Sequence, residues 1–414
     1  MSSATPPAPL DASFAHADVQ RCPFPLISRL HTEAPVYRDP ITQFLVISRY
    51  DDIVYVSQHP ELFSNTTSVI LDRKDSPVAG EVARRYAERG FLPMHTLVTN
   101  DPPSHTRYRA LVDKVFTASF VKDLEPHLVA LCDELIDSFI NDGKVDLLRE
   151  FAIKLPMYLI TAQLGMPRED WQRFKHWSDI SIEMINPTLA PERELQITDD
   201  LIEMQQYIWR RAQEYLATPA PTLLSKLVHV EVDGQRLEPR ELIGIMHQLL
   251  VAGNETTTNA IATGVWMLLR NDEVRRQVLA DRSLIGNFVE EVLRLHAPSP
   301  HLYRQVLQDT EIAGVPVAKD SVLMLSYIAG NHDASKFPAP ECIDLARANG
   351  RQHLAFGRGI HFCIGNQLAR AEMRVAFDRL LTRLPQLRLD PDFPEPQFAA
   401  IYHVRGLEAL RVCF

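Results

Sequence analysis

The sequence contains few cysteines, and their spacing does not support a disulfide framework. Five cysteines are spread over 414 residues, and no two of them are separated by only two residues. Zinc fingers and disulfide-stapled miniproteins carry close cysteine pairs, so both classes are excluded. We therefore expect reduced thiols, which are typical of a reducing compartment.

An excess of positive charge and a long apolar run are also missing. The chain has 43 Lys and Arg against 53 Asp and Glu, a net charge of −10, which disfavours nucleic-acid binding. The most apolar stretch, residues 242–269, contains the polar sequence GNETTTN, whereas a membrane-spanning helix needs about 18 apolar residues. No secretory signal is recognisable at the N-terminus. We expect a cytoplasmic protein with no nucleic-acid or membrane partner.

Helical periodicity is present along most of the chain. We predict helices over residues 104–116, 124–140, 194–217, 239–270, 272–296 and 364–384, and short strands over 43–49 and within 305–325. Residues 64–100 and 184–193 are irregular and polar, as binding loops often are. Prolines near the N-terminus predict a flexible leader over residues 1–19, followed by one domain over 20–414. The fold class is mainly α with small β-sheets.

The predicted helix over residues 239–270 is apolar near both ends and polar at its centre. The centre carries Glu255 and three threonines, which would be costly to bury without partners. Two interpretations stay open. The threonines bond to carbonyls four residues earlier, or the helix opens into a kinked groove beside a ligand cavity. Gly253 favours the opening, because glycine weakens a helix by about 1 kcal/mol relative to alanine.

Cys363 differs from the other cysteines in its surroundings. Gly357 and Gly359 precede it and permit a tight turn. The helix predicted after it would favour a thiolate through its N-terminal amides and dipole. Such a thiolate, without a second cysteine nearby, suits a soft transition metal better than zinc. A nucleophilic role assisted by His361 and an inert buried thiol are the alternatives.

The sequence FGRGIHFCIG at residues 356–365 resembles the haem-binding loop of the cytochrome P450 family, in which a cysteine thiolate ligates the haem iron. Other motifs extend this resemblance. AGNETT at 252–257 is similar to the oxygen-activation motif, EVLR at 291–294 to the Glu-x-x-Arg helix, DPPSHTRYR at 101–109 to the start of a propionate-binding helix, and NHD at 331–333 to the stretch after a small sheet. The resemblance implies a triangular helical prism that encloses haem b, with Cys363 as its axial ligand.

The resemblance also implies roles for individual residues. Those at the haem would be Ala252, Phe356 and Gly365, with His105, Arg109, Arg304 and His361 binding its carboxylates. Thr256 would hydrogen-bond dioxygen, and Glu255 would help to relay protons. Glu291, Arg294 and Arg347 would form a buried structural triad, although a Glu and an Arg three residues apart are usually an ordinary helical surface pair.

The implied activity is that of a monooxygenase, which inserts one oxygen atom of O2 into an apolar terpenoid, steroid, fatty acid or aromatic. Electrons would come from a separate ferredoxin or flavodoxin and its NAD(P)H-dependent reductase. A cationic docking patch could comprise Arg107, Lys114, Arg358, Arg370 and Arg374, unless these residues form a solvated face. The alternatives are a peroxygenase or oxidative coupling enzyme of the same fold, and a non-enzymatic haem carrier or sensor.

The predicted substrate pocket is small and apolar. It would include Val251, Ala252, Pro300 and part of residues 401–404, beginning with Ile401, and Phe91, Leu92 and Met94 would form a mobile lid. These side chains suit a lipophilic guest. No cation is clearly placed to anchor a carboxylate, so a neutral guest is expected.

Overall fold

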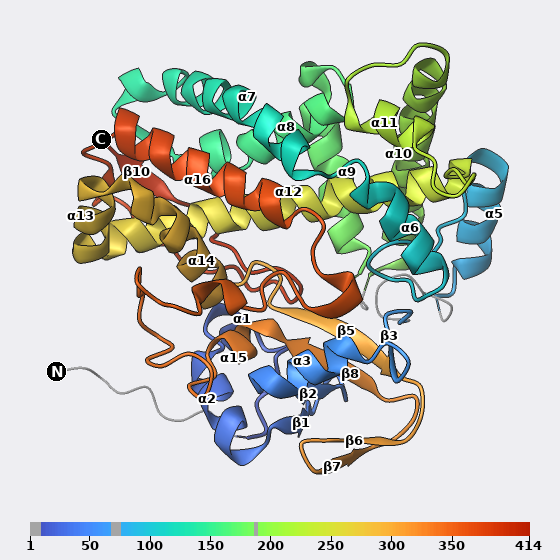
Figure 1. The fold of residues 1–414 in the computed structure, drawn as a ribbon, viewed down its shortest axis with the longest axis horizontal. Coiled ribbons are helices and arrows are strands. Elements are labelled where there is room, and N and C mark those ends of the chain that lie inside the picture. Colours follow the sequence, from blue (N-terminus) through green and yellow to red (C-terminus); the bar gives the residue numbers. More distant parts are fainter. Residues whose placement is uncertain (1–9, 68–75, 186–188) are drawn as a thin grey trace. The chain divides into compact units, whose positions relative to one another are not determined.

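The computed structural model describes residues 10–67, 76–185 and 189–414, which form two compact units (Figure 1). Unit 1 comprises Met1–Ser64, Val129–Ala152 and Thr256–Phe414, and unit 2 comprises Asn65–Leu128 and Ile153–Glu255. Helices α7 (Ala118–Asp137) and α12 (Pro239–Arg270) continue from one unit into the other. A single domain over residues 20–414 stays a prediction.

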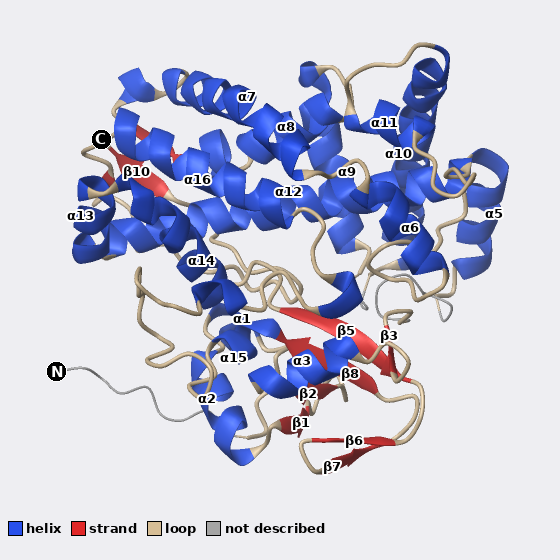
Figure 2. Cartoon of the chain, viewed as in Figure 1, coloured by secondary structure: helices blue, strands red, loops and turns tan. Residues whose placement is uncertain are grey.

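Within the described chain, every strand belongs to unit 1, whereas helices make up most of unit 2 (Figure 2). The helices of unit 1 are α1 (Ala17–Arg21), α2 (Phe24–Glu33), α3 (Tyr50–Gln58), α13 (Asp272–Ala280), α14 (Ile285–Leu295), α15 (Tyr327–Asn331) and α16 (Asn366–Arg383). Its strands are β1 (Val36–Arg38), β2 (Leu45–Ile47), β3 (Phe63–Ser64), β4 (Lys144–Asp146), β5 (His301–Val306), β6 (Thr310–Ile312), β7 (Val315–Val317), β8 (Val322–Ser326), β9 (Arg388–Leu389) and β10 (Arg411–Cys413). The helices of unit 2 are α5 (Ala79–Arg89), α6 (Ser104–Asp113), α8 (Lys154–Gln163), α9 (Trp171–Glu183), α10 (Pro191–Ala217) and α11 (Leu223–His229).

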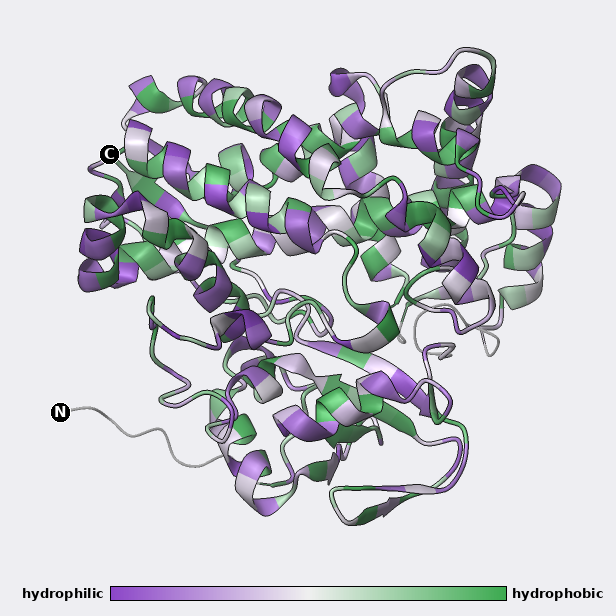
Figure 3. Ribbon diagram, in the orientation of Figure 1, coloured by the Kyte–Doolittle hydropathy of each residue, from purple (hydrophilic) through white to green (hydrophobic). Residues whose placement is uncertain are grey.

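The largest sheet of unit 1 has the strand order β1-β2-β8-β5-β3. Strands β2 and β8 are parallel, and the other neighbours are antiparallel. Apolar side chains of the sheet pack with Ile53 and Val56 of α3 in one buried cluster, and β8 is largely hydrophobic in Figure 3. This cluster supports β5, the strand that carries Arg304.

Helix α5 lies within the region predicted to be irregular, residues 64–100. Its charged residues form ion pairs at helical spacing. Arg84 Nη2 lies 2.8 Å from Glu81 Oε1, and Arg84 Nη1 lies 2.7 Å from Glu88 Oε2. Pairs three and four residues apart stabilise a helix. The polar composition that indicated a loop therefore belongs to a solvent-facing helix. Residues 68–75, from the same predicted region, lie outside the described chain.

The prediction of one helix over residues 272–296 is wrong. The chain forms α13 and α14 instead, separated by a 3₁₀ turn at Arg282–Leu284. The break occurs because the side chain of Asp281 accepts a hydrogen bond from the Ser283 N–H at 2.9 Å, a local bond that competes with helix continuation. By contrast, α12 has the predicted bounds and stays helical through Gly253, with no break in its helix assignment.

The predicted flexible leader differs from the structure after residue 12. Residues 1–9 lie outside the described chain, but Ser13 and Phe14 are buried. The Ser13 hydroxyl donates to Asp39 Oδ1 at 2.7 Å, and the Phe14 N–H donates to Asp39 Oδ2 at 2.9 Å. These bonds attach the N-terminal segment to the chain between β1 and β2.

Candidate functional site

The loop that carries Cys363 is held in a compact form by glycines and by one closing hydrogen bond. Gly357 and Gly359 have φ angles of 68° and 70°, a region that non-glycine residues rarely adopt. A Cβ on Gly359 would lie 2.1 Å from the Ser57 carbonyl oxygen of α3. The Cys363 N–H donates to the Phe356 carbonyl at 2.9 Å, which closes the loop directly before α16.

Cys363 is half-buried, three residues before the start of α16. The Asn366 side chain donates to the Cys363 carbonyl at 2.8 Å and thereby fixes the entry of the chain into the helix. A Cβ on Gly365 would lie 4.0 Å from the Cys363 sulfur, so glycine leaves additional room beside the thiol. A half-buried cysteine sulfur with room beside it can ligate a soft metal.

Arg304 lies on β5 and is a buried cation, with 2% of its surface exposed. Its guanidinium donates to the Tyr303 carbonyl at 2.7 Å, and no carboxylate within the described chain forms an ion pair with it. A buried charge normally requires a partner of opposite sign. The environment of Arg304 therefore fits an acidic group that a bound cofactor supplies, such as a haem propionate.

The other predicted carboxylate-binding residues lie on two further elements. His361 is half-buried in the Cys363 loop of unit 1. His105 and Arg109 lie on α6 of unit 2, and burial lowers the pKa of His105, helped by the charge of Arg109. The Arg109 guanidinium also lies 3.2 Å from the Asp113 carboxylate. Their contact with a haem stays a prediction.

Helix α12 brings Glu255 into contact with a residue that the motifs do not reveal. Glu255 Oε1 lies 2.7 Å from the ammonium nitrogen of Lys175 on α9. Burial raises the pKa of Glu255, and Lys175 opposes that shift. Burial acts to lower the pKa of Lys175, but Glu255 and Asp179 raise it overall. The carboxylate is thus held next to a charge partner in a largely buried position.

The neighbours of Glu255 on α12 include both buried and accessible residues. Asn254 is buried and donates to the Ser178 hydroxyl of α9 at 3.1 Å. Ala252 is exposed and Thr256 is half-buried. Thr258 is buried, and its hydroxyl has no hydrogen bond to any residue that the structure describes, which does not support back-bonding at this threonine.

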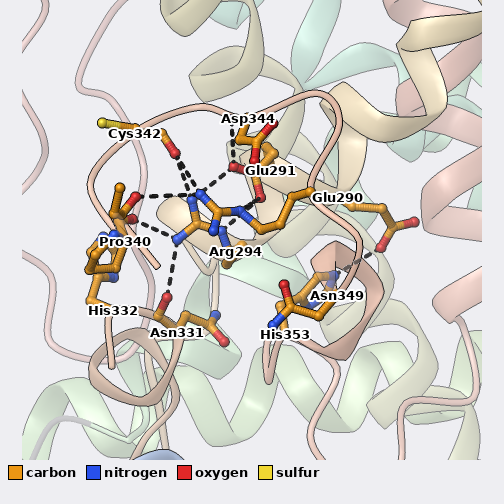
Figure 4. A network of polar contacts seen from close by, with 12 residues as sticks. Glu290, Glu291, Arg294, Asn331, His332, Pro340, Cys342, Asp344, Asn349 and His353 are labelled. Carbon is orange, nitrogen blue, oxygen red and sulfur yellow. Dashed lines mark hydrogen bonds and ion pairs between the residues drawn. The ribbon is translucent and has the colours of Figure 1, made fainter. Parts of the chain in front are cut away.

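The predicted triad of Glu291, Arg294 and Arg347 is present: Glu291 and Arg294 are buried and Arg347 is half-buried. Figure 4 shows Glu291 and Arg294 together. Arg294 binds Glu291 through two parallel bonds of 2.7 and 2.8 Å, and Arg347 Nε lies 3.1 Å from the same carboxylate. Arg294 also donates to the carbonyls of Asn331, Pro340 and Cys342. The triad therefore holds the irregular chain between α15 and the Cys363 loop.

A second network, next to this triad, was missed by the motif analysis. Glu290 Oε1 accepts a bond of 2.7 Å from Arg370 of α16, and Glu290 Oε2 lies 3.0 Å from His353 Nε2. Burial opposes ionisation, but His353 and Arg370 lower the pKa of Glu290 to about 2. The Arg370 guanidinium lies 4.5 Å from the centre of the Phe356 ring. This network links α14 and α16 to the first residue of the Cys363 loop.

Comparison with known proteins agrees with this geometry. Residues 142–397 match the sequence pattern of the cytochrome P450 family. A steroid C26-monooxygenase of Mycobacterium tuberculosis is 36% identical over 386 residues, which cover 93% of this chain and 98% of that protein. The chain belongs to the cytochrome P450 family. It is a P450 monooxygenase, and the family implies a haem-thiolate cofactor.

Other relatives are named for, or were solved with, different small organic molecules. A methyl-branched lipid omega-hydroxylase of Mycobacterium bovis is 35% identical over 88% of this chain and 83% of its own. The solved structure of cytochrome P450 CREJ with (4-ethylphenyl) dihydrogen phosphate has a TM-score of 0.88 at 29% identity and covers 98% of both chains. That of CYP109E1 from Bacillus megaterium with testosterone has a TM-score of 0.81 at 29% identity, over 94% of this chain and 99% of that one. The P450 fold, mainly helical with small sheets, is thereby confirmed.

The predicted substrate-pocket residues of this P450 separate into two groups. Pro300 and Ile401 line one crevice of unit 1 together with Ile328 and Tyr402. Val251 and Ala252 lie on the part of α12 that belongs to unit 2.

Within the described residues, no helix is both long and apolar enough to cross a membrane.

The cationic docking patch needs correction. Hydrogen bonds within their own units join Arg107 to Glu241, Lys114 to the Glu231 carbonyl, Arg358 to the Gln352 carbonyl, and Arg370 to Glu290. Arg107 and Arg370 are thus paired with carboxylates and do not contribute free positive charge. In the predicted lid of Phe91, Leu92 and Met94, side chains of α10 and α12 bond to main-chain groups of Phe91 and Leu92. The mobility of this lid stays a prediction.

Proposed function

We propose that this P450 inserts one oxygen atom of O2 into a C–H bond or alkene of a neutral, lipophilic molecule of the steroid or branched-lipid class, with electrons from a separate donor protein. The observation that carries the proposal is the closed Cys363 loop, in which a half-buried thiol lies three residues before α16. When bound through a thiolate, haem supplies oxygen activation, because the thiolate donates electron density that favours O–O cleavage. Cys363 would provide that ligand.

The haem carboxylates would be bound by Arg304 and His361 of unit 1 and by His105 and Arg109 of unit 2. Support comes from Arg304, which is buried without a carboxylate partner in the described chain. A guanidinium can hold a carboxylate through two parallel bonds. Ala252, Phe356 and Gly365 would contact the macrocycle, and none of the three carries a charge that would have to be desolvated.

Glu255 and Thr256 would move protons toward the dioxygen site. Glu255 is positioned for this because Lys175 holds its carboxylate while burial raises its pKa. A raised pKa makes it easier for this carboxylate to take up a proton and pass it on than for an exposed one. The half-buried Thr256 hydroxyl, which follows it on α12, would accept that proton and donate its own. Asn254 would keep this part of α12 against α9 through Ser178.

The substrate class is supported by the relatives and by the composition of the candidate lining. Two relatives are named for oxidising a steroid and a methyl-branched lipid, and a similar structure contains testosterone. The predicted lining residues Val251, Ala252, Pro300 and Ile401 are uncharged and apolar. An apolar guest is favoured by the removal of its surface from water.

Electrons would come from a ferredoxin, or a flavodoxin, and its NAD(P)H-dependent reductase. Since Arg107 and Arg370 are paired with carboxylates, the docking surface would depend on other cations, among them the exposed Lys114.

The proposal is tested first by spectroscopy of the purified protein. The ferrous carbon monoxide complex should give the thiolate spectrum, and Cys363→Ala should abolish it. Steroids and branched lipids are then screened for the spectral shift that follows displacement of water from the iron. Product formation should require O2, a ferredoxin and a reductase. Equal turnover with peroxide alone would favour a peroxygenase. A wild-type protein that binds haem but forms no product, with a Thr256→Ala variant that binds haem equally well, would favour a carrier.

A further inference from the structure

Side chains of two other helices bind the main chain at the start of the segment between α5 and α6. The Gln205 amide of α10 accepts from the Phe91 N–H at 2.8 Å and donates to the Phe91 carbonyl at 2.9 Å. Arg240 of α12 donates to the carbonyls of Leu92 at 2.7 Å and Pro93 at 2.8 Å. All of these residues belong to unit 2. The segment is therefore anchored at its start.

The same segment then follows α12 for a further turn. A Cβ on Gly244 would lie 3.0 Å from Thr96 Cγ2, so the chain passes directly over this glycine. Gln248 makes the next contact: its Oε1 accepts from the Val98 N–H at 3.1 Å, and its Nε2 donates to the Thr99 hydroxyl at 3.3 Å. One side-chain amide thus fixes two consecutive residues of the segment.

Ala252 is the next position on this face of α12. Residues 244, 248 and 252 are four apart and therefore share one side of the helix. Gly244 and Gln248 are half-buried, whereas Ala252 is exposed. The Val98 side chain is 40% exposed even though its N–H is bound. Two side chains therefore hold the Val98 main chain: Gln248 accepts from its N–H, and Asn65 donates to its carbonyl at 3.0 Å.

We propose that Gln248 is a specificity-determining residue of this P450. It positions Val98 so that Val98 and the Ala252 face of α12 form one apolar wall of the substrate site. This inference rests on the proposed function, because it takes Ala252 to lie beside the cofactor. Gln248 is a positioning residue: it acts through the main chain of Val98. Its amide both accepts and donates, a combination that neither leucine nor glutamate can supply.

The positioning step is tested by hydrogen exchange of the purified protein. In Gln248→Leu the Val98 amide loses its acceptor, and its exchange should accelerate by about fivefold, the factor for one ordinary hydrogen bond. The matched control is Gln206→Leu, because exposed Gln206 also bonds a main-chain carbonyl, that of Arg89, at 2.6 Å. Gln206→Leu should leave the exchange at Val98 unchanged. Equal exchange at Val98 in Gln248→Leu and the wild type would overturn the inference.

The specificity step is tested with imidazole and 4-phenylimidazole as probes. Both carry the same metal-binding ring, so the ratio of their dissociation constants isolates the space available to the phenyl group. We expect Gln248→Leu to change this ratio by about tenfold with the imidazole constant nearly unchanged, and Gln206→Leu to leave the ratio as it is. In Gly244→Ala the added methyl group presses on Thr96 from the same helix face, so this variant should alter the ratio as well. It replaces Gln248→Leu in the test if that variant does not fold.

The two possible failures are distinguishable. A wild-type protein that lacks the thiolate spectrum and does not bind imidazole contradicts the proposed function, and the inference with it. A wild-type protein with that spectrum, combined with an unchanged ratio in Gln248→Leu and in Gly244→Ala, overturns only the assignment of Gln248.

Discussion

The carboxylate of Glu255 lies 2.7 Å from the ammonium group of Lys175. The two residues are 80 positions apart in the sequence, on α12 and α9, and both side chains are largely buried. Proximity to an opposite charge stabilises the ionised carboxylate, whereas burial destabilises it. Lys175 therefore controls how readily the proposed proton donor becomes protonated.

Replacing Lys175 should change the pH dependence of turnover. In Lys175→Gln the charge that stabilises ionised Glu255 is removed, so the pKa of Glu255 should rise further. If Glu255 donates a proton, activity falls as pH rises through this pKa, and the fall moves to higher pH in the variant. The measurement is the pH profile of kcat, together with the fraction of consumed electrons that appears in product.

Arg173→Gln is the control for that experiment. Arg173 lies on the same helix as Lys175 but pairs with Glu203 at the surface, so its profile should match the wild type. A Lys175→Gln profile that also matches the wild type would show that the ion pair does not govern the proton donor.

Breaking the buried triad should be strongly destabilising. Arg294→Met removes a fully buried guanidinium and leaves the Glu291 carboxylate without its two strongest bonds. The free energy of unfolding should fall by about 3–5 kcal/mol, measured by urea unfolding. Arg236→Met, which breaks an exposed pair with Glu231, should cost less than about 1 kcal/mol. Similar losses in both variants would contradict the assigned structural role.

Glu372 should make the protein less stable as pH rises. It is buried on α16, its Oε2 has no hydrogen bond within the described chain, and burial raises its pKa to about 8 from an ordinary value of 4.5. The folded protein holds the proton that the unfolded chain releases above pH 4.5. Stability from this group is complete below pH 4.5 and is lost as pH rises toward 8.

Glu372→Gln should therefore be more stable than the wild type by roughly 3–5 kcal/mol at pH 8 and nearly equal to it at pH 4. Glu290→Gln should behave in the opposite way. The pKa of Glu290 is lowered to about 2, so its stabilisation is present above pH 4.5 and lost as pH falls toward 2. Urea unfolding from pH 2 to 8 compares the two variants, and a pH-independent difference for Glu372→Gln would argue against a protonated carboxyl.

Removing Arg304 should weaken haem retention more than folding. Arg304→Gln eliminates a buried cation that has no carboxylate partner in the described chain, so the folded protein loses no ion pair. Losing a hydrogen bond to a charged group costs about 1.5–3 kcal/mol, which corresponds to a roughly 10- to 100-fold weaker affinity for haem. The measurement is haem transfer to apomyoglobin, with Arg388→Gln as an exposed control on β9. Equal transfer rates for both variants and the wild type would exclude a carboxylate-binding role.

The sequence alone determined those features whose cause is local. The bounds of α12 follow from its own apolar periodicity and agree with the structure over Pro239–Arg270. The compact Cys363 loop follows from Gly357 and Gly359, whose positive φ angles require no distant contact. The motif at 291–294 likewise places Glu291 and Arg294 on one helical turn, because the spacing is a property of the helix itself.

Only the tertiary structure decided which charges are paired and which side chains hold the functional segments. Lys175 reaches Glu255 across 80 residues, Arg370 reaches Glu290 across 80, and Gln248 reaches the Val98 amide across 150. A lysine, an arginine or a glutamine on an amphipathic helix has the same local sequence whether it faces solvent or a buried partner. Its role depends on which helices pack together, because electrostatic attraction and hydrogen bonding act over a few ångströms in space, irrespective of separation along the chain.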